Sequence, residues 1–251
     1  MKPKPIIAFA VQTIPIVKSG DNLAEMIIQS FNSVGQELLD KDVIVIASKI
    51  VSKAENRVVL ATQVEVSSEA KGIAEMNGFD PVHVELALRE SSEVIKNDGV
   101  LITETHSGLV CNFSGVDRSN APDGEYVLLP EDPDRSAKLI HEYLVKKTGR
   151  KVGVIVSDTQ GRPWRKGSIN IAIGCAGIGA FKHNKGKRDL YGRILQRSTV
   201  CQIDELASLA EPLMGQAGQR IPVVVVRGYE YSEGSERASD IIRPKEDDMF
   251  R

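Results

Sequence analysis

Short, continuous apolar runs mark the strands that we expect in this chain. Most of them consist of consecutive β-branched residues rather than alternating apolar and polar ones, which is typical of strands covered on both faces. The expected strands occupy residues 6–11, 43–47, 99–103, 152–156 and 223–226.

Three helices are predicted from capping residues followed by apolar positions at helical spacing. Asp21 can cap the first of them. Asp80 and Asp132 are each followed by proline, which is favoured at the first helical position. The expected helices run over residues 22–39, 81–94 and 133–144. Strands are not regularly followed by helices, so the pattern favours an α+β arrangement over a doubly wound sheet.

The domain organisation follows from length and composition. The 251 residues are 41% hydrophobic, enough for a sizeable core. Residues 1–251 can therefore form a single large domain or two closely packed lobes. Residues 232–251 are strongly charged, and we expect this tail to be flexible in part.

Two polar segments, 112–124 and 158–168, each follow an apolar run, and we interpret both as loops of the kind that carry chemistry. In the second, Asp158 and Thr159 stand at a strand end with three cationic residues close behind. A carboxylate and a hydroxyl in this position are typical of a site for a hard cation and its phosphate ligands. The alternative is a solvated turn whose charges pair with one another.

Asp117 and Asn120 offer a second carboxylate and an amide in the first of these segments. Mg²⁺ or Mn²⁺ bound with a nucleotide uses typically one or two protein carboxylates, so Asp117 and Asp158 form our candidate pair. The alternative is that Asp117 only forms a turn with Ser119 or Asn120.

A further candidate is the pair Lys49 and Lys53, which directly follows the apolar run 43–47. On a helix this spacing puts both ammonium groups on one face, where they can reach one polyphosphate. The alternative is an exposed helix start with compensating charges. The glycine-containing segment 214–221 offers Gln216 as an oxygen ligand, whereas Gly215 is equally explained as a helix C-cap.

Charge and cysteine content narrow the function classes. With 32 Lys and Arg against 34 Asp and Glu, the formal net charge is -2, so no excess of positive charge favours binding to nucleic acid. The three cysteines are widely separated and form no C-x-x-C pair, which suits a reducing compartment. No apolar run approaches the roughly 20 residues that span a bilayer, so we expect a cytoplasmic protein without a membrane partner.

Several familiar catalytic motifs are missing from the sequence. It contains no G-x-x-x-x-G-K-[ST] loop, no G-x-S-x-G elbow and no H-x-x-x-H pair. The segment GCAGIG at residues 174–179 is not a dinucleotide-binding fingerprint, and we interpret it as close packing of small residues.

Taken together, the ordered motifs of this chain resemble the coenzyme F-420-0:γ-glutamyl ligase family. The residues that carry the resemblance are TIPIVKSGDNL, VIVIASKIVSKAENRVV, GVDRSN, GRKVGVIVSDTQGRPWRKG with INIAIGCAGI, KRDLYGR, and LMGQAG before IPVVVVRG. They run through almost the whole chain. The resemblance implies a two-lobed α+β fold, a homodimer, and a site for GTP and divalent metal (Mg²⁺ or Mn²⁺, with K⁺ as an additional cation).

The resemblance also implies roles for individual residues. Metal ligands would be Asp117, Asp158, Thr159 and Gln216, of which Asp117 and Asp158, with Lys53, would be catalytic. The positions where the family holds GTP correspond here to Ile14, Pro15, Ile16, Val17, Ser48, Lys49, Lys53, Asn120, Met214, Gly215, Gln216, Ala217, Gly218, Gln219, Arg220 and Ile221.

The implied reaction joins L-glutamate to coenzyme F-420-0 through an acyl phosphate, with release of GDP and phosphate. The product would be F-420-1, with F-420-2 after a second, γ-linked addition. Two alternatives stay open: a metal-dependent phosphatase or phosphotransferase, and a non-catalytic nucleotide-binding protein. Dependence on glutamate separates the ligase from the first, and turnover separates it from the second.

Overall fold

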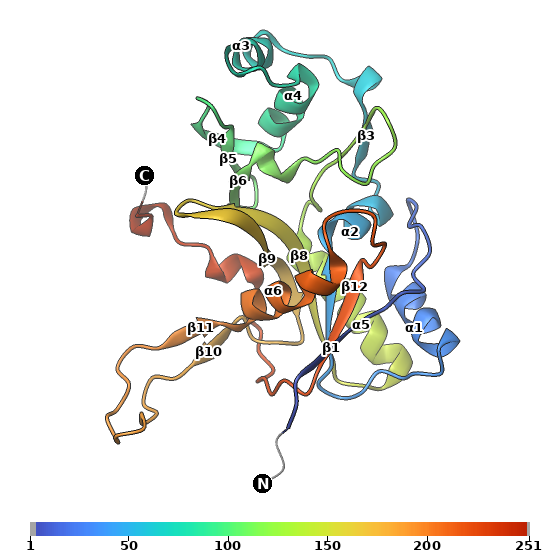
Figure 1. The fold of residues 1–251 in the computed structure, drawn as a ribbon, viewed down its shortest axis with the longest axis vertical. Coiled ribbons are helices and arrows are strands. Elements are labelled where there is room, and N and C mark those ends of the chain that lie inside the picture. Colours follow the sequence, from blue (N-terminus) through green and yellow to red (C-terminus); the bar gives the residue numbers. More distant parts are fainter. Residues whose placement is uncertain (1–3, 250–251) are drawn as a thin grey trace.

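The computed structural model describes residues 4–249 and is built around a mixed five-stranded sheet (Figure 1). Only β2 and β8 pair in parallel within this sheet; its other pairs are antiparallel. The strand order is β1 (Ile7–Ala10), β12 (Val223–Arg227), β2 (Val43–Ala47), β8 (Gly153–Arg162) and β9 (Arg165–Ala176).

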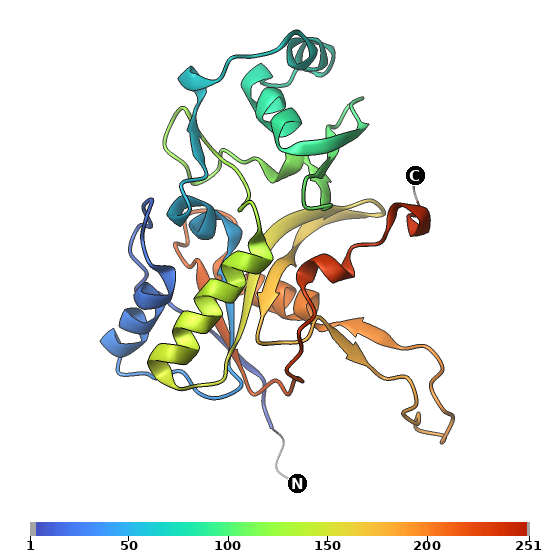
Figure 2. The same ribbon diagram turned by 180° about the vertical axis from the view of Figure 1, so that it is seen from behind.

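Helices cover both faces of this sheet, as its continuous apolar strands require. Alternate residues of β2, β8 and β12 point to opposite sides and join two separate hydrophobic clusters. One face packs against α1 (Leu23–Ser33) and α5 (Pro133–Thr148), and the other against α6 (Gln202–Met214), as Figures 1 and 2 show from opposite sides. Full burial of each Val or Ile contributes about 1.5–3 kcal/mol.

Residues 48–128 leave the central sheet and return to it. After α2 (Ser48–Ala54) they form smaller sheets and helices with two hydrophobic clusters of their own. The elements in order are β3 (Val58–Leu60), η1 (Ala61–Gln63), α3 (Ser68–Asn77), α4 (Pro81–Arg89), β4 (Ser91–Lys96), β5 (Ile102–Thr105), β6 (Val110–Asn112), η2 (Phe113–Gly115) and β7 (Glu125–Val127).

Two further segments complete the described chain. The strands β10 (Phe181–His183) and β11 (Thr199–Cys201) pair with each other and project from the body as an arm. The tail contains η3 (Ala238–Ile241) and η4 (Lys245–Asp247). The carboxylate of Asp134 fastens this tail, because it accepts hydrogen bonds from the amides of Ala238 (2.9 Å) and Ser239 (3.1 Å).

The structure confirms the predicted α+β class, and strands form within or overlapping all five expected runs. The predicted close packing of 174–179 is also confirmed. A Cβ at Gly174 would lie 2.2 Å from the carbonyl oxygen of Pro133, and one at Gly177 would lie 2.4 Å from the ring of His141. The two lobes, the homodimer, the domain limits 1–251 and the flexibility of 232–251 stay predictions; residues 250–251 of that tail and 1–3 lie outside the described residues.

Several predicted boundaries are wrong; the helix after Asp132, for example, continues to Thr148 rather than ending at Leu144. The first helix starts after Asn22 rather than Asp21 and stops at Ser33, because Gly35 adopts a left-handed φ of 66°. The helix after Asp80 stops at Arg89, since the following residues pair as β4 with β5. Residues 158–168 are not a loop but the tip of the β8–β9 hairpin, in which Arg162 pairs with Arg165 across a two-residue turn.

No helix in the described part of the chain combines the length and apolar character needed to cross a membrane.

Candidate functional site

The strand order gathers most of the predicted site segments at one end of the central sheet. The parallel pairing of β2 with β8 ends where Ala47 lies opposite Ser157, and β8 continues from there to Arg162. The antiparallel β12 begins at the same end, where the amide of Ala47 donates to the carbonyl of Pro222 (2.9 Å). β1 ends there too, opposite Val224. Four predicted site segments therefore start or finish at this end of the sheet, where ligands commonly bind in α/β sheets. They are residues 14–17, 48–53, 158–159 and 214–221.

A hydrogen bond from Ser48 connects α2 to β8. Its buried hydroxyl donates to Oδ1 of Asp158 at 2.7 Å. Burial raises the pKa of Asp158 to about 6, although the hydrogen bond from Ser48 opposes this shift. A buried carboxylate whose charge is this poorly compensated favours binding of a cation.

Lys49 joins the second carboxylate to this cluster. Its Nζ lies 2.6 Å from Oδ2 of Asp117 and donates to the carbonyl and hydroxyl oxygens of Ser119 at 2.6 and 2.7 Å. Burial alone would raise the pKa of Asp117, but hydrogen bonds from Lys49 and Ser119 outweigh it and lower that pKa. Asp117, Asp158 and Lys49 thus form one charged cluster contributed by three parts of the chain.

Lys53 lies one turn further along α2 and contacts the same loop. Its Nζ donates to the carbonyl oxygen of Asn120 at 2.7 Å, and Asn120 has a left-handed φ of 54°. Burial, followed by repulsion from Lys49, lowers the pKa of Lys53. The two ammonium groups share one helix face, as predicted, and such a crowded pair favours an anionic ligand.

The remaining predicted metal ligands form a separate cluster. Thr159 Oγ1 lies 2.9 Å from Oδ1 of Asn170 and 3.1 Å from Oε1 of Gln216. Nε2 of Gln216 donates to Glu211 at 3.0 Å. Because neighbouring strand residues point to opposite faces, Thr159 faces α6 whereas Asp158 faces the α5 side. The four residues therefore lie as two pairs at one strand end.

The loop after α6 has a folded shape of its own. Gly215 caps the helix with φ of 67°, and a Cβ there would lie 2.4 Å from Cδ of Gln219. Oε1 of Gln219 in turn accepts from the amide of Ala217 at 2.8 Å. The interpretation of Gly215 as a helix C-cap is therefore confirmed, whereas the approach of this loop to a ligand stays a prediction.

The segment 14–17 packs beside α2. Val17 is buried and belongs to the same hydrophobic cluster as Val51 of α2, while Ile16 is exposed. Just beyond, the amide of Gly20 donates to the carbonyl of Ala54 at 2.9 Å. This segment thus borders the helix that carries both lysines.

The sequence predicted one of these contacts, the turn at Asp117, only as an alternative interpretation, and it did not predict others. The turn between Asp117 and Ser119 is present, with the Ser119 amide donating to Oδ1 at 2.8 Å. The contributions of Asn170 and Glu211 were missed, because nothing in their local sequence distinguishes them. Only the strand register opposite Thr159 and the path of α6 bring them to the site.

The donor set fits a divalent metal that arrives with a nucleotide. Within residues 4–249, no group of three or more His, Cys, Asp or Glu side chains is arranged to hold a metal ion. Two carboxylates with hydroxyl and amide oxygens are nevertheless typical of Mg²⁺ sites that complete their coordination with phosphate and water. The ammonium group of Lys49 already shows that a positive charge is accommodated at Asp117.

Comparisons with known proteins show the family of this chain. A model of the F420-0:Gamma-glutamyl ligase family matches residues 12–228. A protein of Methanothermobacter thermautotrophicus named coenzyme F420:L-glutamate ligase is 45% identical over 251 residues, which cover 98% of this chain and 99% of that protein. Proteins of the same name from Methanocaldococcus jannaschii (44%, covering 95% and 94%) and Archaeoglobus fulgidus (40%, covering 97% and 95%) are similar.

Proposed function

Because the chain belongs to the F420-0:Gamma-glutamyl ligase family, we propose that it uses GTP to add L-glutamate to coenzyme F-420-0. The observation that supports this proposal best is the cluster of Asp117, Asp158 and Lys49 beside β8, next to the end of β2. It combines the carboxylates and cations that a nucleotide triphosphate with its metal requires.

In this proposal each residue of the site contacts either a metal ion or the nucleotide. Asp117 and Asp158 would hold a divalent metal, with Thr159 and Gln216 as ligands of a second one. When bound, Mg²⁺ or Mn²⁺ neutralises charge on the phosphate oxygens. Lys49 and Lys53 exchange their contacts with the 117–120 loop for contacts with phosphate. The loops 14–17 and 214–221 flank the nucleotide.

The reaction has two steps. A carboxylate oxygen of F-420-0 attacks the γ-phosphorus of GTP, the bond to the β-phosphate oxygen breaks, and GDP leaves. The amine nitrogen of glutamate then attacks the acyl carbon, phosphate departs with the carbon–oxygen bond pair, and the amine loses a proton. The first addition gives F-420-1, and a second, γ-linked addition gives F-420-2. The active form is a homodimer, with K⁺ as an additional cation.

The proposal is tested by mass-resolved incubation with F-420-0, L-glutamate, GTP and Mg²⁺ or Mn²⁺, leaving out each component in turn. We expect a glutamate-sized mass increase together with GDP and phosphate, and no product when any one component is absent. GTP loss that continues without glutamate or F-420-0 would instead favour a phosphatase. GTP binding without any turnover would favour a non-catalytic protein.

A further inference from the structure

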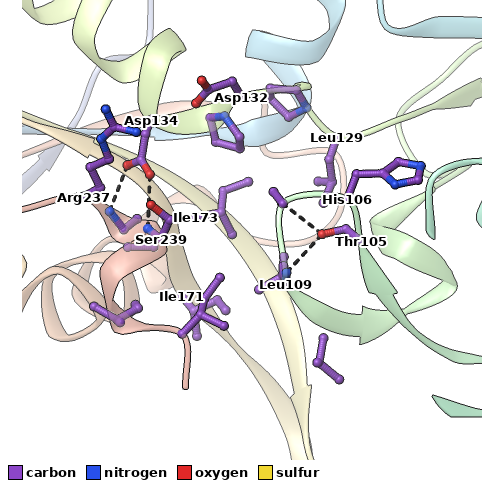
Figure 3. Close-up of a pocket in the computed structure, with 18 of the residues that line it drawn as sticks. Thr105, His106, Leu109, Leu129, Asp132, Asp134, Ile171, Ile173, Arg237 and Ser239 are labelled. Atoms are coloured by element: carbon purple, nitrogen blue, oxygen red, sulfur yellow. Dashed lines mark hydrogen bonds between the residues drawn. The ribbon is translucent and has the colours of Figure 1, made fainter. Parts of the chain in front are cut away.

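A cavity of about 740 Å³ lies beside the site but contains none of the residues assigned to GTP or metal. It is enclosed by β9, the start of α5, residues 105–110 and the tail (Figure 3). Its walls include the apolar side chains of Leu109, Leu129, Ile171, Ile173 and Ile242. Cavities of roughly 300–1,000 Å³ with mainly apolar walls suit ligands larger than a free amino acid.

Strand register connects this cavity to the charged cluster. Ile171 on β9 lies directly opposite Asp158 on β8, so the two side chains are neighbours on one face of the sheet. Strand β6 lines the cavity with Val110 and also contacts β8. A ligand in the cavity can therefore extend past Ile171 and reach the carboxylate of Asp158 on β8.

The acidic groups around the cavity are largely occupied by protein partners. Asp134 accepts from the amides of Cys175, Ala238 and Ser239, and Asp132 caps α5 through the amide of Arg135. Glu90 and Glu131 are both paired with Arg57.

Arginines line the cavity beside these carboxylates. Arg237 and Arg243 belong to the tail, and Asp248 lines the cavity with them. A guanidinium group binds planar anions in a bidentate manner, so the two arginines can contact an anionic group of a ligand.

We propose that this cavity binds the deazaflavin part of F-420-0, with the apolar walls around the planar ring and the anionic chain directed past Ile171 towards Asp158. The inference rests on the proposed function, because it assigns the acceptor substrate of that reaction to a place. Free glutamate has no ring to fill apolar walls of this extent, and the residues proposed to hold GTP do not line the cavity.

The test compares Ile242→Glu, which puts a negative charge on the cavity wall, with Leu139→Glu, which changes an exposed leucine on the outer face of α5. Binding of F-420-0 is measured through its fluorescence, with and without GDP and Mg²⁺. We expect the Kd to rise at least about tenfold for Ile242→Glu and to stay unchanged for Leu139→Glu. Arg243→Ala, which leaves the wall intact, should also weaken binding, by roughly three- to tenfold.

The KM values for F-420-0, GTP and glutamate separate the substrates. A rise confined to F-420-0 supports the assignment, whereas unchanged binding in both cavity variants, or a rise confined to GTP or glutamate, overturns it. The two proposals fail independently. If binding of F-420-0 is sensitive to Ile242→Glu but no glutamate is added, the cavity assignment stands and the ligase proposal fails. If the chain is an active ligase that neither variant affects, the proposed function stands and the cavity assignment fails.

Discussion

Asp158 is the residue on which the proposed chemistry depends most. Asp158→Asn keeps the shape and the contact with Ser48 but removes the charge that would hold the metal. We expect ligase activity to fall at least about a hundredfold, while the melting temperature stays the same or rises, because a poorly compensated buried charge is removed. Activity and thermal unfolding are measured on the same preparation.

The matched control for this substitution is Asp98→Asn, which changes an exposed aspartate between β4 and β5. It should leave both activity and melting temperature unchanged. Normal turnover by Asp158→Asn would remove Asp158 from the metal site.

His83 gives a pH-dependent prediction. Its ring stacks on Phe113 with centroids 4.2 Å apart, and burial lowers the pKa of His83 below its usual 6.5. The folded state thus prefers the neutral ring, so its contribution is fully present above about pH 6.5 and is lost as the pH falls towards the lowered pKa. We expect the free energy of unfolding to decrease between pH 7.5 and 5.5, and to decrease less in His83→Gln.

Denaturant unfolding at both pH values checks this prediction. Other groups titrate over the same range, so the comparison between the two proteins carries the test. An equal decrease in the variant would show that His83 is not the responsible group.

At the scale of elements, the packing of β9 against α5 leaves no room for a side chain at Gly174. A Cβ there would lie 2.2 Å from the carbonyl oxygen of Pro133, which is backbone and cannot move aside cheaply. We expect Gly174→Ala to lower the free energy of unfolding by about 2–3 kcal/mol. In the same hairpin a Cβ at Gly161 would meet nothing within 4 Å, so Gly161→Ala should change it by less than about 1 kcal/mol. Urea denaturation of both variants measures the difference; equal effects would argue against the clash.

The sequence predicted those elements whose signals are local. Buried β-branched runs identify β2 and β12, and aspartate followed by proline identifies the starts of α4 and α5. Residues 158–168 were misassigned because β8 and β9 extend beyond the end of β2, so their polar side chains lack the apolar pattern of a covered strand. The end of α4 was missed because the pairing of β4 with the following strand β5, and no stop signal within the helix itself, ends the helix.

At the scale of the whole molecule, the site depends on topology that no single segment encodes. The lysine pair and the two aspartates could be predicted as candidates from their residue types. They come together around Lys49 only because α2, the 117–120 loop and β8 lie next to one another. The cavity could not be predicted at all, because its walls come from β9, the start of α5, residues 105–110 and the tail, which are distant in sequence.

The same arrangement predicts how metal and nucleotide stabilise the whole chain. Since no group of three or more His, Cys, Asp or Glu side chains within the described residues is arranged to hold a metal ion, Mg²⁺ alone should bind weakly, and the phosphates of GTP should complete its coordination. We expect Mg²⁺ alone to leave the melting temperature almost unchanged. The complex of GTP with Mg²⁺, taken as one ligand at a hundred times its Kd, should add about 2.7 kcal/mol of stability, which EDTA reverses in large part.

Thermal unfolding in the presence of GDP, GTP, Mg²⁺ and EDTA, alone and combined, measures this coupling. In Asp158→Asn the additional stabilisation by Mg²⁺ over GTP alone should disappear, because that variant lacks one carboxylate of the pair, whereas Asp98→Asn should retain it. A full shift with Mg²⁺ alone would mean that the chain already forms a complete metal site without nucleotide. Asp117 and Asp158 would then need further protein ligands, and Thr159 and Gln216 would be the first to examine, because they lie at the same strand end.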